Sequence, residues 1–369
     1  MGETKWKYFD FWLLGAVAVL VVFGVTVIRS AIAGNIDALN KNIVSRQLLF
    51  AAIGFAFIFL VAAIDYHLWA SISLPMYAIT AVALAALTIA GQALYGSARW
   101  FDTGVILIQP SELAKIVVIL VLADFFTRHQ HQLGNPAWIL RSLIYALGIM
   151  VWILLQPNLS TSLVILVIWF ALLWVSGLKL RYLALAVVVG VVLPFLAFPF
   201  LQDYQQKRIM NFIQPEAEAS YGDIYNIQQA LIAIGSGGVL GKGYAQGPQV
   251  QLRFLKVRWS DFIFAVIGEE FGFIGTVLVL LLLLFVIWRC VRAARLARDN
   301  YGALICYGVA VLLAFQTIVN VGVNMQLMPA TGLTMPFVSY GGSSLLSLLV
   351  GIGLVESVIL RHKTLEFTK

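Results

Sequence analysis

The chain has 369 residues, of which 61% are hydrophobic and only 11% are charged. A water-soluble protein of this length cannot bury so much apolar surface and keep a hydrated exterior, so that class is excluded. The formal net charge of +7 fits membrane topology and contact with anionic headgroups, and it does not indicate nucleic-acid binding. The apolar runs are long and lack strand-like alternation, which predicts an all-α, polytopic integral membrane protein rather than a β-barrel.

Hydropathy at about 20 residues per helix predicts ten membrane spans. The first apolar run is not followed by a small-residue cleavage site, so we expect a spanning helix rather than a cleaved signal peptide. The whole chain, 1–369, is expected to form a single transmembrane domain, with 202–260 as a large extracytoplasmic loop between spans seven and eight. In chain order the predicted spans are roughly 11–33, 48–64, 69–94, 111–126, 138–155, 159–175, 180–201, 261–288, 303–329 and 342–360.

Lysine and arginine predict the orientation of these spans. One set of loops and tails is rich in both, whereas the short loops of the other set carry only four such residues, and the positive-inside rule makes the rich set cytoplasmic. Both termini are then cytoplasmic, and the long loop 202–260 lies outside. The basic residues of the rich set are Lys5, Lys7, Arg128, Arg141, Lys179, Arg181, Arg289, Arg292, Arg295, Arg298, Arg361, Lys363 and Lys369.

The fourth predicted span opens with "IQPSELAK", which places two charged residues inside an apolar helix. Glu112 and Lys115 are spaced i,i+3, so they share a helix face and can form an ion pair that makes both charges tolerable in the bilayer. Ionisable residues within a span also mark a functional interior. Just upstream, "GSARWFDTG" brings Arg99 and Trp100 to the outer boundary of the membrane, where a lipid headgroup is in reach.

Two further stretches interrupt the apolar pattern on the outer side. "LLQPNLSTS" carries Gln156 and Asn158 between the fifth and sixth spans. "MPATGLTMPFVSYGGSS" contains two prolines and three glycines together with Ser339 and Ser343. Irregular backbone at this depth is tolerated only where it lines a cavity or packs against protein.

The outer loop is the largest segment outside the predicted spans. "YNIQQALIAIG" predicts a helix along the membrane surface, with Ile227, Leu231 and Ile234 on one face. The following "GSGGVLGKG" lacks the spacing of a P-loop, so it is either a looser phosphate cradle or a flexible turn. The basic residues of the loop indicate either a solvated surface or a zone that binds a phosphorylated lipid; they are Lys207, Arg208, Lys242, Arg253, Lys256 and Arg258.

The loop ends at "VRWSDFIFAVIGEEFGFIG", where Asp261 stands at the membrane boundary. Asp261 can cap the helix that follows, or it can accept a proton or ligate a divalent metal. Arg258 and Lys256 lie close in sequence and favour its ionised form. Glu269 and Glu270 lie about 12 Å deeper and are expected to face a polar interior or a neighbouring helix. The two cysteines, Cys290 and Cys306, are expected to be free thiols.

Six of these stretches, in order from about residue 96 to 344, resemble the SEDS family of ten-helix membrane glycosyltransferases, which polymerise lipid II into peptidoglycan. They are "GSARW", "IQPSELAK", "QPNLSTS", "IAIGSGGVLGKG", "SDFIFAVIGEEFG" and "MPFVSYGGSS". The chain looks most like the elongation members, with the division members as the nearest alternative. The resemblance implies a bacterial cytoplasmic membrane protein with an outward-facing site.

The resemblance also implies roles for individual residues. Asp261 matches the essential aspartate of the family, as proton acceptor or as ligand to Mg²⁺ or Mn²⁺, and no organic cofactor is implied. Glu112 and Lys115 match a pair in the central cavity. The predicted substrate and cavity residues are Glu112, Lys115, Arg99, Trp100, Arg208, Lys242, Lys256, Arg258, Gln156, Asn158, Ser339 and Ser343. The implied partners are lipid II, the nascent strand, membrane lipids and a class B penicillin-binding protein.

The chain departs from the family pattern at two places. Before Asp261 the family commonly has "LPERHTD", but here the residues are "LKVRWSD", with Lys256, Val257 and Trp259 at three altered positions. Asn158 stands where the family usually has an aspartate. A lipid II flippase is the rival interpretation, since buried charges and a polar cavity serve transport equally well. A purely structural scaffold for cell-wall enzymes is a third.

Overall fold

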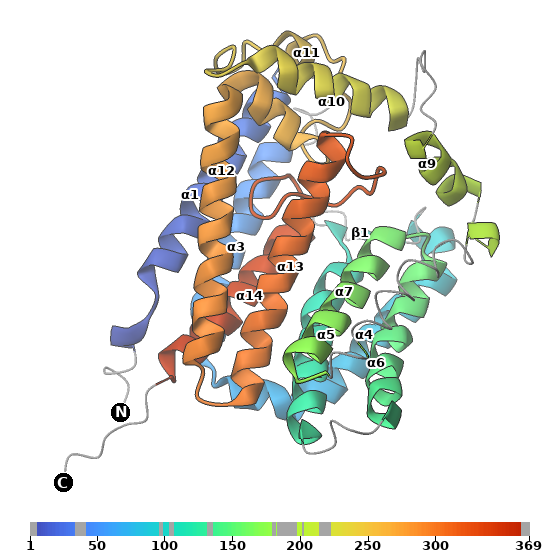
Figure 1. The fold of residues 1–369 in the computed structure, drawn as a ribbon, viewed down its shortest axis with the longest axis vertical. Helices are drawn as coiled ribbons and strands as arrows, with labels where there is room; N and C mark the ends of the chain where they lie inside the picture. The colour runs from blue at the N-terminus through green and yellow to red at the C-terminus, as the bar shows by residue number, and fades with distance from the viewer. Residues whose placement is uncertain are drawn as a thin grey trace.

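The chain folds almost entirely into helices that run side by side as one bundle, seen in a computed structural model (Figure 1). The structure describes residues 6–33, 42–95, 99–102, 107–130, 136–178, 182, 198–200, 203–213 and 223–362. The long helices are α1 (Phe11–Ala31), α3 (Ile43–Ala63), α4 (Tyr66–Tyr95), α5 (Pro110–Arg128), α6 (Pro136–Leu155), α7 (Leu159–Val175), α12 (Ile263–Leu296), α13 (Asn300–Asn324) and α14 (Gly342–Leu360).

In sequence, the shorter elements lie before α1, between α4 and α5, and between α7 and α12. They are η1 (Trp6–Tyr8), η3 (Phe198–Phe200), α9 (Asp203–Ile213), α10 (Asp223–Gly237), α11 (Pro248–Gln251) and a hairpin of β1 (Phe101–Asp102) and β2 (Leu107–Ile108). The two strands pair in antiparallel fashion, with Phe101 opposite Ile108. This all-α, polytopic architecture confirms the predicted fold class.

Nine of the ten predicted spans coincide with the nine long helices of the described residues. The remaining predicted span, 180–201, lies largely outside the described residues. Within the described part of the chain, seven helices are long and apolar enough to cross a membrane by themselves. The two others are α7, which is shorter, and α5, which carries charged residues along its length. Glu112 and Lys115 are buried, so the bundle shields these two charges from lipid.

Three helix ends differ from the prediction by five residues or more. Helix α3 begins at Ile43, five residues before the predicted start at 48. Helix α13 stops at Asn324, five residues early, because the N–H of Leu327 turns back to the carbonyl of Gly322 at 2.7 Å. Helix α12 continues to Leu296 through the arginine-rich stretch, because arginine, alanine and leucine all favour helix. A hydropathy profile detects neither the backbone turn after α13 nor the helix propensity of the arginine-rich stretch.

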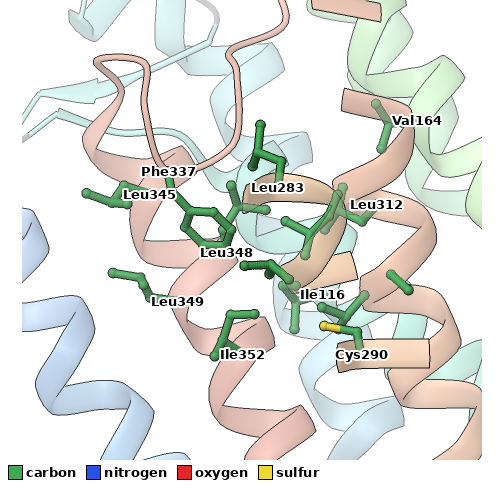
Figure 2. Packing of buried hydrophobic residues seen from close by; sticks show 14 of the residues in the cluster. Ile116, Val164, Leu283, Cys290, Leu312, Phe337, Leu345, Leu348, Leu349 and Ile352 are labelled. Atoms are coloured by element: carbon green, nitrogen blue, oxygen red, sulfur yellow. The ribbon is translucent and has the colours of Figure 1, made fainter. Parts of the chain in front are cut away.

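The core forms where α14 packs against α3, α5 and α13, with α12 and α7 beyond it. Figure 2 shows apolar side chains from several of these helices meeting Phe337, which comes from the irregular segment between α13 and α14. Phe337 and Val338 are both buried, so this proline- and glycine-rich segment folds back into the bundle. The expectation that irregular backbone here packs against protein is confirmed.

Helices α1 and α12 run antiparallel along one edge of the bundle (Figure 1). At one end, the Ser30 hydroxyl donates a hydrogen bond to Glu270. At the other, Arg289 pairs with Asp10. Twenty residues separate Asp10 from Ser30, about 30 Å of helix, which matches the thickness of the hydrocarbon core.

Helix α12 is interrupted near its start, and the glycine cluster of the outer loop forms hydrogen bonds with the backbone groups that the interruption leaves unpaired. Gly272 has φ 65° and ψ −161°, so the carbonyls before it lose their helical partners. The N–H of Lys242 donates to the carbonyl of Glu269 at 2.9 Å, and that of Gly243 to the carbonyl of Glu270 at 3.0 Å. The cradle alternative for this loop is therefore not supported, because these N–H groups serve α12 and not a phosphate.

The amides that follow the break are satisfied by the same loop. Phe273 donates to the carbonyl of Gly238 at 2.9 Å, and Ile274 to that of Val239 at 3.2 Å. A Cβ added at Gly272 would lie 2.3 Å from the nitrogen of Gly241, so only glycine allows this approach. The outer loop is thus docked onto α12 by backbone hydrogen bonds.

The paired carboxylates on α12 strengthen this docking. Glu269 accepts hydrogen bonds from the N–H groups of Gln249 (2.8 Å) and Val250 (3.1 Å), and Glu270 accepts one from Ser30. The expectation that both face a polar interior or a neighbouring helix is confirmed. Glu269 thus holds the outer loop on α12, and Glu270 joins α12 to α1.

The helix predicted in the outer loop is α10, and it packs on α12 (Figure 1). The prediction of which residues form the apolar face of α10 is partly wrong. Ile227 is buried, as are Ala230 and Ala233, but Leu231 is exposed. The close approach of Gly237 to Gly268 turns the small residues, rather than Leu231, toward α12.

Candidate active site

A cavity of about 450 Å³ opens at the end of the bundle where α5, α7, α12 and α14 begin. It brings together side chains from segments far apart in the sequence, including Asp261, Glu112 and three arginines. Its walls are both polar and apolar, as suits an amphipathic ligand. The lining residues are Arg46, Phe50, Arg99, Trp100, Leu107, Gln109, Glu112, Asn158, Thr161, Arg208, Trp259, Ser260, Asp261, Thr331, Gly332, Leu333, Thr334, Tyr340, Gly341, Gly342 and Ser344.

The backbone around Asp261 is held by hydrogen bonds to consecutive carbonyls. The Trp259 carbonyl accepts from the N–H of Tyr340 at 2.9 Å, and the Ser260 carbonyl accepts from the Ser339 hydroxyl at 2.6 Å. The Asp261 carbonyl accepts from the side-chain amides of Asn320 and Asn324, each at 3.0 Å. The position of the carboxylate is therefore fixed by α13 and by the segment before α14.

The N-cap residue of the helix that follows is Phe262, not Asp261. Helix α12 begins at Ile263, and its Ala265 N–H is capped by the side-chain oxygen of Asn324 at 3.1 Å. The Asp261 side chain accepts instead from the Ser260 hydroxyl at 2.9 Å and lines the cavity. Asp261 therefore lies one residue before the N-cap position and lines the cavity.

The irregular segment before α14 approaches Asp261 from the other side. Gly332 has φ +71°, and a Cβ added there would lie 3.4 Å from the carboxylate of Asp261. Gln47 of α3 holds the same segment, because its amide donates to the carbonyl of Ser339 at 3.2 Å and accepts from the N–H of Gly341 at 3.3 Å. The segment thus lines the cavity as well as packing in the core.

The predicted ion pair in α5 is present. The Lys115 ammonium lies 2.7 Å from the Glu112 carboxylate, and Lys115 is completely buried. Glu112 lies in the first turn of α5, where the helix dipole favours a negative charge, and it lines the cavity. The pair therefore forms part of the wall, with Glu112 facing the space and Lys115 behind it.

Three arginines reach the cavity from three separate elements: Arg46 from α3, Arg99 from the segment before β1, and Arg208 from α9. Arg99 also donates to the carbonyls of Gln156 (2.9 Å) and Pro157 (2.5 Å), which fixes its place. Arg46 lies just before the predicted span 48–64 and was not among the predicted site residues. No motif marks it, and only the packing of α3 brings it to the site.

Three other predicted basic residues are not among the lining residues. Lys242 and Lys256 are exposed outside the cavity. Arg258 is buried, and its guanidinium donates to the carbonyls of Ala31 and Leu255. Burial lowers the pKa of Arg258 from its ordinary value. Lys242 and Arg258 were expected to contact phosphate, and their positions outside the cavity lining do not support this expectation. The positive charge of the cavity lining comes from Arg46, Arg99 and Arg208 instead.

The remaining predicted residues divide between lining and support. Asn158 lines the cavity and caps α7, accepting from the N–H of Thr161 at 3.2 Å, so an amide serves where the family usually has a carboxylate. Gln156 is buried and donates to the Leu84 carbonyl of α4 at 3.0 Å. The Ser343 hydroxyl accepts from the N–H of Gln109 and donates to the carbonyl of Leu107, which fastens the hairpin to α14.

The residues at the cavity could hold a divalent cation in only one binding mode, in which one carboxylate and the substrate phosphates are the ligands. Among the described residues, no three His, Cys, Asp or Glu side chains come together as a metal-holding group. Glu112 is paired with Lys115, which leaves Asp261 as the carboxylate suited to a cation. Mg²⁺ is commonly held by one or two carboxylates plus substrate phosphates, so Asp261 fits that mode and an all-protein cage does not fit.

Both cysteines are free and buried, as predicted. They lie on α12 and α13, away from the cavity. The site chemistry is thus carried by carboxylate, guanidinium and amide groups.

Comparison with known proteins gives consistent matches over nearly the whole chain. The FtsW/RodA/SpoVE family model, described as cell cycle protein, matches residues 11–364. Peptidoglycan glycosyltransferase MrdB of Escherichia coli strain K12 is 34% identical, over 99% of this chain and 97% of that protein. A chain of a solved peptidoglycan synthase complex that coordinates polymerization and crosslinking aligns with a TM-score of 0.79 at 29% identity, over 96% of this chain and 99% of that one. Rod shape determining protein RodA of Thermus thermophilus aligns with a TM-score of 0.69 at 28% identity, covering 95% and 96%.

Proposed function

Because the chain belongs to the FtsW/RodA/SpoVE family of membrane glycosyltransferases, we propose that it polymerises lipid II into glycan strands at the cavity beside Asp261. This is the SEDS family that the six motifs predicted. The observation that carries the proposal is the convergence of Asp261, Glu112 and arginines from three elements on one cavity. A carboxylate and several guanidiniums are the groups that transfer from a pyrophosphate-linked sugar requires.

The chemistry assigns separate tasks to these groups. The 4-hydroxyl of an incoming lipid II attacks the anomeric carbon of the growing strand, so a new C–O bond forms while the bond to undecaprenyl pyrophosphate breaks. The hydroxyl proton passes to Asp261. In the alternative, Asp261 would hold a Mg²⁺ or Mn²⁺, which would supply positive charge to the pyrophosphate, and the hydroxyl proton would pass to solvent. Arg46, Arg99 and Arg208 stabilise the negative charge of the departing pyrophosphate. Displacement of an α-linked donor gives a β-linked strand without an enzyme-bound sugar.

We also propose that the cavity faces the outside of the bacterial cytoplasmic membrane and that both termini are cytoplasmic. The arginines at the far end of α12 support this orientation under the positive-inside rule. The outer loop, 202–260, joins the cavity end through Arg208 and Trp259. A cysteine introduced near Lys256 should react with an impermeant maleimide in whole cells, and protection there would contradict the orientation.

A class B penicillin-binding protein is the proposed partner, and cell elongation is the proposed role. The solved synthase complex of a similar chain supports the first, and the similarity to a rod shape determining protein supports the second. Depletion from a rod-shaped host should give rounded cells. Filaments would assign the protein to division instead.

The direct test is incubation of purified protein with fluorescent lipid II, with and without Mg²⁺ or Mn²⁺, followed by gel analysis. A glycan ladder is the expected product. A flippase would yield no polymer but would move labelled lipid II across the bilayer of a proteoliposome. Transport without any polymer would overturn the proposed enzyme.

A further inference from the structure

A second cavity, of about 340 Å³, lies at the opposite end of the bundle from Asp261. It forms where α1 begins and where α12 and α14 end, the end at which both described chain ends lie (Figure 1). Asp10, which lines it, is about 30 Å along α1 from Ser30, so the cavity sits at the surface of the membrane. Its lining residues are Tyr8, Phe9, Asp10, Phe11, Trp12, Arg289, Arg292, Ala293, Leu296, Ile359 and His362.

Two guanidiniums one turn apart on α12 give this cavity its charge. Arg289 donates from Nε to the Asp10 carboxylate at 2.6 Å and also pairs with it through Nη2. Asp10 accepts from the N–H of Leu13 as well, which fixes it at the start of α1. Arg292 is exposed, lies 5.7 Å from the ring of Trp288, and pairs with no carboxylate of the described residues. Because Asp10 balances the charge of Arg289, the positive charge of Arg292 is left as a net charge among the lining residues.

Aromatic and apolar surface surrounds these charges. Phe11, Trp12 and Trp288 are 66%, 75% and 50% exposed, as is typical of aromatic residues at a membrane–water interface. From the cavity toward the far end, exposed apolar residues continue on α1 and α12, among them Val19 and Leu284. A small soluble anion needs only the charges, whereas a lipid uses the charges and the adjoining apolar faces together.

We propose that this cavity binds the headgroup of an anionic phospholipid, with the phosphate at Arg292 and Arg289 and the acyl chains along α1 and α12. The bound lipid bridges the two helices at the end opposite the Ser30–Glu270 contact. The site stands apart from the catalytic cavity, and the proposal does not depend on the reaction carried out there. It requires only that an anionic headgroup be preferred over a zwitterionic one of the same chain length.

The test is native mass spectrometry of the detergent-purified full chain, titrated with dioleoyl phosphatidylglycerol or with dioleoyl phosphatidylcholine. The wild type should bind the first phosphatidylglycerol at least about fivefold more tightly than phosphatidylcholine, since a basic residue near a headgroup contributes about that factor. Arg292→Gln should lose about fivefold in phosphatidylglycerol affinity, and Arg292→Lys should recover most of it.

The matched control is Arg295→Gln, because Arg295 is exposed on the same helix, one turn further on, but does not line the cavity. That variant should keep wild-type affinity. An equal loss in both variants would reduce the effect to general surface charge and overturn the site. Equal binding of the two lipids, or displacement of the lipid by glycerol phosphate alone, would also overturn it, the latter by showing a site for a soluble anion.

Discussion

Replacement of Asn324 by alanine should lower the rate of catalysis as well as the stability of the fold. The Asn324 amide donates to the carbonyls of Asp261 (3.0 Å) and Asn320 (2.8 Å), and its oxygen caps Ala265 at 3.1 Å. Asn320 also donates to the Asp261 carbonyl at 3.0 Å, so each asparagine supplies half of the support for that carbonyl. The residue that carries the reactive carboxylate is thereby tied to α13.

The expected magnitude follows from the hydrogen bonds that are lost. Each bond to the Asp261 carbonyl contributes about 1 kcal/mol net, which is about fivefold in rate if it serves only to hold Asp261 in its reactive position. Asn324→Ala should therefore lower kcat by about fivefold or more, and Asn320→Ala by a similar factor. The double variant, which leaves the carbonyl without either donor, should lose at least about 25-fold.

The assay is the rate of lipid II polymerisation by purified variants, with unfolding temperature measured in the same detergent. Thr317→Val is the matched control, since its hydroxyl donates to Leu313 on the same buried helix and does not reach Asp261. The control should keep wild-type kcat. If Thr317→Val and Asn324→Ala lose kcat equally, or if KM changes instead of kcat, the positioning argument is wrong.

Three further variants test other parts of the account. Glu112→Gln leaves the buried Lys115 ammonium without its partner and should cost about 3–5 kcal/mol of stability, seen as a lower unfolding temperature that Lys115→Met on the same chain partly restores. Ser339→Ala removes the bond to the Ser260 carbonyl and should lower kcat by about fivefold, with no loss of expression. Gly272→Ala forces φ 65° on a residue with a side chain and brings its Cβ to 2.3 Å from Gly241, so the outer loop should become sensitive to protease; wild-type resistance would contradict the docking role of this break.

Much of the bundle could be predicted because its signals are local in sequence. Long apolar runs set the spans, and the spacing of Glu112 and Lys115 along one helix was enough to predict their ion pair. The end of α13 was missed because its last predicted residues are mostly apolar, although the backbone there turns back to Gly322. Hydropathy measures side-chain polarity and does not detect such a turn.

The site was harder to predict than the fold because its members are joined only by packing. Arg46 lies on α3, some two hundred residues from Asp261 in sequence, and no spacing rule connects the two. Arg258 is three residues from Asp261, yet its guanidinium turns toward the carbonyl of Ala31 and braces α1. Nearness in sequence therefore predicted the wrong basic residue as a cavity residue. The glycine cluster resembled a phosphate-binding loop in sequence, but in the structure it provides hydrogen bonds to the break in α12 at Gly272.

One measurement tests the assignment of Asp261 most directly: polymerisation of fluorescent lipid II by purified Asp261→Asn beside the wild type. Asparagine keeps the shape of the side chain and its bond from Ser260, but it can neither accept the proton nor hold a divalent cation well. We predict a folded protein with wild-type unfolding temperature and no glycan ladder, with or without Mg²⁺ or Mn²⁺. Full-length glycan strands made by this variant at the wild-type rate would contradict the account.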